Sequence, residues 1–159
     1  MFERFTRDAR KVVTSAVEEA GRRDDTRIGT EHLLIAVASS PALTGIFAAP
    51  EELRDQLDRL DQDALRSVGL DPALLDVTPP SRAGSRNKHL PFTGAAKDTL
   101  SGALKEAVAL GHRHIGVEHI ALALVTGTGP DRGRAILEGL DFSPDQLRAS
   151  LLRHIERAS

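Results

Sequence analysis

Apolar residues recur every three or four positions along most of this chain, the spacing typical of amphipathic helices. The first such stretch runs from Arg4 to Gly21, and we expect Thr6 to cap it and Gly21 to end it. A second predicted helix has Thr30 as its cap and ends before Pro41. The pattern therefore predicts two helices joined by a polar turn in the first part of the chain.

The middle of the chain is harder to interpret. Pro50 can occupy the first position of a helix, since Leu53, Leu57 and Leu60 keep helical spacing after it. Two short helices are predicted to follow, one over residues 61–68 and one from Asp71. Residues 77–91 are rich in proline, glycine, serine and basic side chains, so they are expected to form a solvated linker.

The helical pattern restarts after this linker. Phe92 and Thr93 open a predicted helix, and residues 111–114 form a turn before an apolar helix over residues 118–125. Residues 127–130 break that helix, and helices over 132–140 and 143–155 complete the chain. We therefore predict an all-α protein.

The second half repeats the first. Residues 5–37 and 92–124 align without a gap and share 11 identities in 33 positions. The string Ile-Gly-x-Glu-His occurs at residues 28–32 and again at 115–119. A further match lies at a shorter offset, so the first copy holds 15 extra residues, expected between positions 42 and 60.

We expect one domain made of two four-helix repeats, which pack together around a pseudo-two-fold axis because neither can bury its apolar faces alone. Repeat one covers residues 1–76, the linker 77–91 and repeat two 92–157.

The composition narrows the possible functions. The formal net charge is -2 and the chain has no cysteine, tryptophan or tyrosine. These features argue against a nucleic-acid partner, disulfides and thiolate metal sites. No run of apolar residues is long enough to span a membrane, and the N-terminus does not have the pattern of a signal peptide. A cytoplasmic location with no membrane partner is expected.

Tandem repeats that each run Phe-Thr-x-x-Ala and then Ile-Gly-x-Glu-His resemble the N-terminal domain of Clp-type AAA+ unfoldases. The opening Met-Phe-Glu-Arg-Phe-Thr is most similar to the ClpC branch. The resemblance covers nearly the whole chain and implies a non-enzymatic domain that binds substrates and adaptors of a Clp protease system, including unfolded and phosphoarginine-tagged proteins. The chain has no nucleotide-binding P-loop motif. If 159 residues is the natural length, the protein is expected to be a free-standing N-domain without ATPase modules.

The two motif strings are the candidate ligand sites. Each places a carboxylate in the first turn of a helix, where unpaired N–H groups suit a phosphate and the carboxylate suits a guanidinium. By the resemblance, Glu31 with Thr30 and Glu118 with Val117 would hold phosphoarginine. Val117 lacks the hydroxyl cap expected of Thr30, so the second site is predicted to bind more weakly. A purely structural role is the alternative, since acidic residues complement the helix dipole at this position.

The resemblance also implies a groove between the repeats that receives cyclic-peptide antibiotics. Its residues would be Phe2, Arg10, Val13, Val17, Phe92, Lys97 and Leu104. A decoy that sequesters such peptides is therefore the alternative function.

No cofactor, metal or catalytic site is expected. His32 and His119 each precede apolar residues, which indicates packed, hydrogen-bonded side chains. Three histidines, His112, His114 and His119, lie near one another in the second repeat, but the first repeat has Asp25 and Arg27 at the matching positions of the turn.

Overall fold

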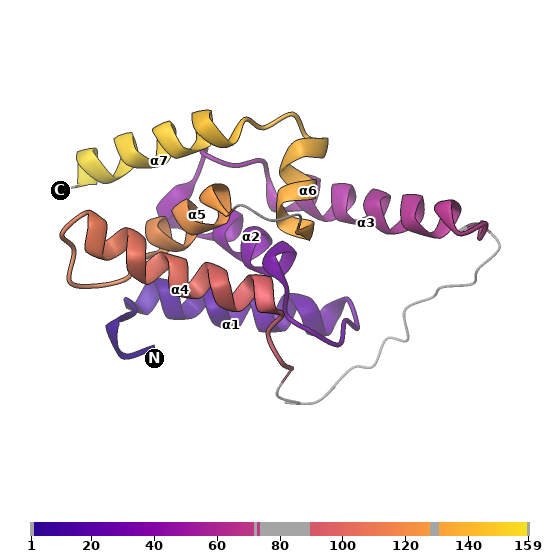
Figure 1. Ribbon diagram of the computed structural model, residues 1–159, viewed down its shortest axis with the longest axis horizontal. Helices are drawn as coiled ribbons and strands as arrows, with labels where there is room; N and C mark the ends of the chain where they lie inside the picture. Colours follow the sequence, from indigo (N-terminus) through magenta and orange to yellow (C-terminus); the bar gives the residue numbers. More distant parts are fainter. Residues whose placement is uncertain (1, 72, 74–89, 128–130, 159) are drawn as a thin grey trace.

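The computed structural model describes residues 2–71, 73, 90–127 and 131–158, and over these residues the chain is all-α (Figure 1). The first repeat contributes η1 (Phe2–Arg4), α1 (Arg7–Arg22), α2 (Thr30–Ser39), η2 (Pro41–Leu43) and α3 (Pro50–Ser67). The second contributes α4 (Gly94–Ala109), α5 (Val117–Thr126), α6 (Arg132–Gly139) and α7 (Pro144–Ala158).

Helices α2 and α5 form the centre of the fold. Each has ten residues, and the structure buries nearly all of each. Both helices are apolar on every side, so they can be stable only when other helices surround them. Helix α2 packs against α1, α3 and α6, and α5 packs against α4 and α7, while α2 and α5 contact each other. The two repeats therefore share one core, as the pattern predicted.

Reciprocal backbone hydrogen bonds join the repeats. The N–H of Thr6 donates to the carbonyl of Ile115, and the N–H of Thr93 donates to the carbonyl of Ile28, both at 2.9 Å. The N–H groups of the same isoleucines donate in return to the carbonyls of Arg4 and Pro91, also at 2.9 Å. Each repeat thus pins the motif string of the other, which is the arrangement that a pseudo-two-fold axis requires.

Several local predictions are confirmed. Thr6 and Thr93 cap α1 and α4, each hydroxyl accepting the N–H three residues later at 3.1 Å. Pro50 occupies the first position of α3 as expected. The helices predicted over 50–60 and 61–68 are, however, one continuous α3, because neither proline nor glycine interrupts residues 51–67. The helix predicted from Asp71 and most of the linker lie outside the described residues.

One cap prediction is wrong. Helix α2 is capped at Gly29, and Thr30 is already its first helical residue. The backbone N–H of Gly29 donates to Nδ1 of His32 at 2.9 Å, so this helix start is held by a histidine at the third helical position and not by a threonine hydroxyl.

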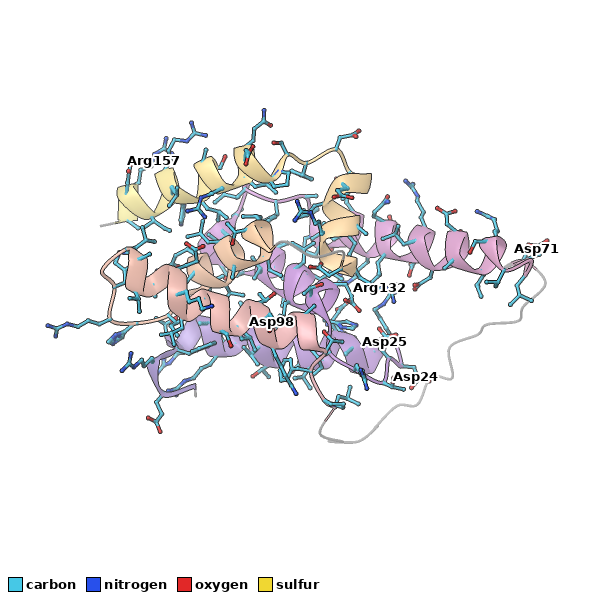
Figure 2. All side chains as sticks on the ribbon, in the orientation of Figure 1. Asp24, Asp25, Asp71, Asp98, Arg132 and Arg157 are labelled. Carbon is cyan, nitrogen blue, oxygen red and sulfur yellow. The ribbon has the colours of Figure 1, made fainter. Side chains whose placement is uncertain are left out.

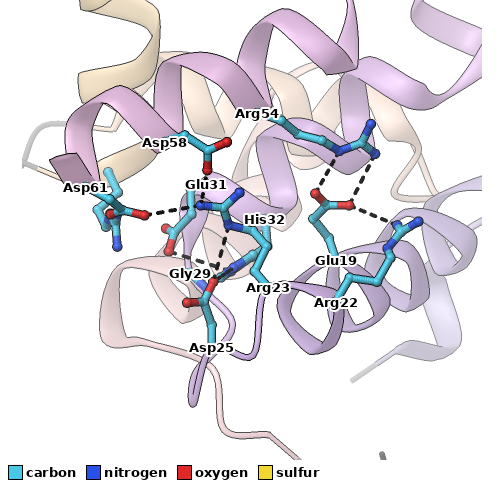
Figure 3. A network of polar contacts seen from close by, with 11 residues as sticks. Glu19, Arg22, Arg23, Asp25, Gly29, Glu31, His32, Arg54, Asp58 and Asp61 are labelled. Carbon is cyan, nitrogen blue, oxygen red and sulfur yellow. Dashed lines mark hydrogen bonds and ion pairs between the residues drawn. The ribbon is translucent and has the colours of Figure 1, made fainter. Parts of the chain in front are cut away.

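Equivalent glutamates tie each first helix to a different neighbour. Glu19 is 3% exposed and accepts two hydrogen bonds from Arg54 of α3, at 2.8 and 3.2 Å (Figure 3). Its counterpart Glu106 lies 3.5 Å from Arg148 of α7. The repeats therefore differ in the packing outside their shared core, where α3 takes a role that α7 has in the second copy.

The turn after the first helix of each repeat requires a left-handed residue. Asp24 has φ of 60° and the equivalent Gly111 has φ of 72°. We expect Gly111→Ala to lower the free energy of unfolding by about 1 kcal/mol, because a Cβ is unfavourable in this conformation. Gly111→Asp should cost less, since aspartate tolerates this region and occupies the matching turn. Urea unfolding of the two variants measures the difference, and equal losses would contradict this account.

Candidate functional site at the starts of α2 and α5

The two motif strings build the same local geometry. In each, the glycine is the N-cap, the glutamate is the second helical residue and the histidine is the third. His119 accepts the N–H of Gly116 at 2.8 Å, as His32 does for Gly29. The glutamate is thereby left out of the cap.

Each glutamate side chain instead folds back over its glycine. A Cβ added at Gly29 or Gly116 would lie 2.7 Å from the carboxylate carbon of Glu31 or Glu118. Only glycine leaves room for the carboxylate in this position, so the glycine and the glutamate of the motif depend on each other.

Exposure separates the two starts. The Glu31 side chain is 9% exposed and the Glu118 side chain is 30% exposed. Helix α6 of the second repeat also contacts the α2 start, through Thr30. The Thr30 hydroxyl donates to Asp131 at 2.8 Å and accepts the N–H of Gly133 at 3.0 Å. Thr30 is therefore engaged in holding α6 to α2.

An ion-pair network surrounds the α2 start (Figure 3). Arg23 donates to Asp58 at 2.9 Å and to Asp61 at 3.2 Å, and its Nε lies 3.7 Å from Asp25. Arg132 of α6 pairs with Asp61 as well, and Figure 2 shows Arg132 and Asp25 at this side of the molecule. Burial lowers the pKa of Arg23, but the hydrogen bond and charge of Asp58, with the charges of Asp25 and Asp61, outweigh it and raise the pKa. Arg23 therefore stays charged.

The α5 start has a different electrostatic environment. Leu110 stands at the position matching Arg23, and His112 stands at the position matching Asp25. His119 is 2% exposed, and its Nε2 lies 2.8 Å from Nδ1 of His112. Burial lowers the pKa of His119, the charge of His112 adds to this effect, and the carboxylates of Glu118 and Glu106 oppose it. Among the described residues, no arginine beside the α5 start forms ion pairs like those of Arg23 with Asp58 and Asp61.

The sequence ranked the two helix starts by whether a hydroxyl caps the helix. The structure does not support that criterion. Thr30 does not cap α2, and Val117 is a core residue, 1% exposed. Replacing threonine with valine at the second start therefore removes no cap. In this structure the second start is the more open of the two.

The residues predicted for the groove lie on α1, on α4 and just before α4. Arg10 and Lys97 are exposed and Leu104 is 39% exposed, while Val13, Val17 and Phe92 are partly buried against the core. The Phe2 side chain lies outside the described part of the structure. A hollow of about 530 Å³ on α1 is lined by Arg10 but by none of the other predicted groove residues.

Among the described residues, no three histidine or acidic side chains are placed to hold a metal ion. No described helix is both long and apolar enough to cross a membrane.

Sequence reasoning missed the network around Arg23. The one available signal was the departure of Arg23 from the repeat, because the matching residue is leucine. Its partners Asp58 and Asp61 lie on α3, 35 and 38 residues further along the chain, and the sequence does not indicate which residues of α3 contact Arg23.

Comparison with known proteins agrees with this fold. Residues 91–159 match the Clp repeat (R) N-terminal domain family. The chain is 34% identical over 98% of its length to the chaperone protein ClpC2, chloroplastic, of Oryza sativa subsp. japonica. It is 33% identical over its full length to a ClpA homologue of Cyanidium caldarium, described as an ATP-dependent Clp protease ATP-binding subunit. The chain spans 16% and 17% of these two relatives.

Solved structures share the same architecture. The N-terminal domain of ClpD from Arabidopsis thaliana superimposes with a TM-score of 0.69 at 22% identity, covering 98% of this chain and 97% of that one. The N-terminal domain of Hsp104 from Candida albicans gives a TM-score of 0.62 at 18% identity, covering 94% and 90%. The chain belongs to the Clp N-terminal domain family and is ClpC-like in sequence.

Thr30 provides a test of the contact between the repeats. We expect Thr30→Val to lower the free energy of unfolding by about 1–3 kcal/mol, because it leaves the buried N–H of Gly133 without an acceptor. Thr44→Val, at an exposed threonine, should change it by less than about 0.5 kcal/mol. Urea denaturation compares the two. Unchanged stability in Thr30→Val would contradict the structural role assigned to this hydroxyl.

Proposed function

We propose that this Clp N-terminal domain is a non-enzymatic binding module that recognises phosphoarginine-tagged or peptide segments of substrates and adaptors of a Clp protease system. The ligand is held at the α5 start. The single observation that carries this proposal is the partly exposed Glu118 carboxylate, positioned over Gly116 at the N-terminus of a buried helix.

The chemistry of the α5 start suits such a ligand. The first N–H groups of a helix lack intrahelical partners and carry a partial positive charge, so they favour a phosphate. The Glu118 carboxylate can pair with a guanidinium through charge-assisted hydrogen bonds. Because His119 takes the cap hydrogen bond, the carboxylate is available for a ligand.

The α2 start is a weaker candidate in this chain. Glu31 is buried, and both hydrogen bonds of the Thr30 hydroxyl are made to residues at the start of α6. A ligand there would have to displace α6 or the ion pairs of Arg23. We therefore assign the α2 start mainly to holding the repeats together.

Partly exposed apolar groups on α1 and α4 favour one second function, a decoy that sequesters cyclic-peptide antibiotics. Leu104 is 39% exposed, and Val13 and Val17 on α1 are only partly buried. Such groups, flanked by Arg10 and Lys97, suit an apolar peptide with polar edges. A cytoplasmic location, for either function, stays a prediction from the sequence.

Free phosphoarginine tests the main proposal. We expect Glu118→Gln to weaken binding by about 10-fold or more, because a charge-assisted hydrogen bond contributes about 1.5–3 kcal/mol. Glu31→Gln is the matched control and should change affinity by less than about 3-fold, since its side chain is buried. Isothermal titration calorimetry measures both. The proposal fails if phosphoarginine does not bind the unaltered protein, or if the control loses as much affinity as Glu118→Gln.

A cyclic peptide that inhibits ClpC-type unfoldases tests the decoy function. We expect Leu104→Ala to weaken its binding several-fold, on the order of 1 kcal/mol for the lost apolar contact, while leaving phosphoarginine affinity unchanged. Glu118→Gln should weaken phosphoarginine binding and leave the affinity for the cyclic peptide unchanged. If the cyclic peptide binds equally well to the unaltered protein and to Leu104→Ala, the groove assignment is wrong.

A further inference from the structure

The α5 start is capped by a histidine whose two ring nitrogens are both engaged. Nδ1 of His119 accepts the N–H of Gly116 at 2.8 Å, and Nε2 lies 2.8 Å from Nδ1 of His112. An amide N–H can only donate, so Nδ1 of His119 carries no proton. The single proton of the neutral ring is then on Nε2 and is donated to His112. The chain Gly116–His119–His112 is complete only when both imidazoles are neutral.

Adding one proton breaks this chain wherever it binds. A proton on Nδ1 of His112 turns the acceptor for His119 into a donor, so two N–H groups face each other. A proton on Nδ1 of His119 removes the acceptor of the Gly116 N–H. In either case one of the two hydrogen bonds at the α5 start is lost.

The α2 start is capped by a histidine in the same way, but the residue that contacts Nε2 of this histidine differs. Nε2 of His32 lies 2.7 Å from a carboxylate oxygen of Asp25, in place of a second imidazole. An ionised carboxylate can only accept a hydrogen bond, whereas an imidazole nitrogen accepts when it is unprotonated and donates once it carries a proton. The chain therefore contains one cap that ends in a carboxylate and one that ends in an imidazole.

The charges around the histidine pair are few among the described residues. On α5 itself, the Glu118 carboxylate lies 3.8 Å from Nδ1 of His119. On α4, Glu106 acts on His119 and is contacted by Arg148 of α7 at 3.5 Å. Arg113 and His114 are exposed in the turn that carries His112. Protonated His119 would thus have Glu118 as its nearest counter-charge.

We propose that the His112–His119 pair is a proton switch that makes ligand binding at the α5 start fall when the pH drops. The inference rests on the proposed function, because it concerns the same Glu118 carboxylate. With both rings neutral, Gly116 is capped and Glu118 is available. With a proton on the pair, the cap loses a hydrogen bond, and a cationic His119 competes with the ligand guanidinium for Glu118.

The direction of the effect follows from linkage. Burial lowers the pKa of His119, so the capped form binds fewer protons than the uncapped form. Its advantage is complete above the ordinary histidine value and is lost as the pH falls below it. The α2 start should show no such dependence over the same range.

The chain itself supplies the matched variants. His112→Asp gives the α5 start the acceptor found at α2, and Asp25→His gives the α2 start the acceptor found at α5. His114→Asn removes an exposed histidine from the same turn and should change nothing. The probe is free phosphoarginine, whose own phosphate titrates identically with every variant.

We expect the affinity of the unaltered protein for phosphoarginine to fall about 3- to 10-fold more than that of His112→Asp between about pH 7.5 and about pH 5.5. Amide exchange measured without ligand provides a second result. Exchange at Gly116, corrected for its intrinsic pH dependence, should become faster at low pH in the unaltered protein but not in His112→Asp. In Asp25→His, the amide of Gly29 should acquire the same behaviour.

The outcomes separate the two proposals. Equal pH dependence in the unaltered protein and His112→Asp, in both affinity and Gly116 exchange, overturns the switch and leaves the binding function standing. No binding of phosphoarginine near pH 7.5 overturns the binding function, and with it any control of binding by the pair. The Gly116 exchange comparison would still show whether the pair controls the cap.

Discussion

The structure depends on four backbone hydrogen bonds that each repeat exchanges with the other. The segment before α1 pairs with Ile115, and the segment before α4 pairs with Ile28. Because each isoleucine directly precedes a motif glycine, these bonds fix where α2 and α5 begin. Neither helix start is positioned by its own repeat alone, so duplication of the unit is a structural requirement here. The shared core of α2 and α5 then follows, since both apolar helices enter the same interior.

Identical motif strings nevertheless have different surroundings. In the first repeat, α6 closes over Thr30, and the carboxylates of α3 hold Arg23 beside Glu31. In the second repeat, Val117 enters the core and the Glu118 side chain keeps 30% of its surface exposed. A few substitutions account for this asymmetry, because the residues matching Arg23 and Asp25 are Leu110 and His112. One copy is thus adapted to join the repeats, and the other presents its carboxylate.

The helices and the repeat were predictable from the sequence because they depend on local periodicity and on short strings. Thr6, Thr93 and Pro50 have the expected roles, since a cap or a first helical position is decided within four residues. The role of Thr30 was not predictable. Its hydroxyl is bound by Asp131 and Gly133, more than a hundred residues away, and no periodicity reports such a contact. The exposure of Glu31 and Glu118 also depends on long-range packing, so the sequence did not indicate which of the two carboxylates is the more exposed.

The order of residues in the motif leaves its glutamate outside the helix cap. In a common capping box, a glutamate at the third helical position reaches back to the N–H of the cap residue. Here histidine holds that position and accepts that N–H, and the glutamate is moved one residue earlier. The carboxylate therefore adds negative charge at the positive end of the helix dipole and does not accept the N–H of the cap residue. An imidazole can do this only while it is neutral, so the arrangement that frees Glu118 also makes it depend on the protonation of its neighbour.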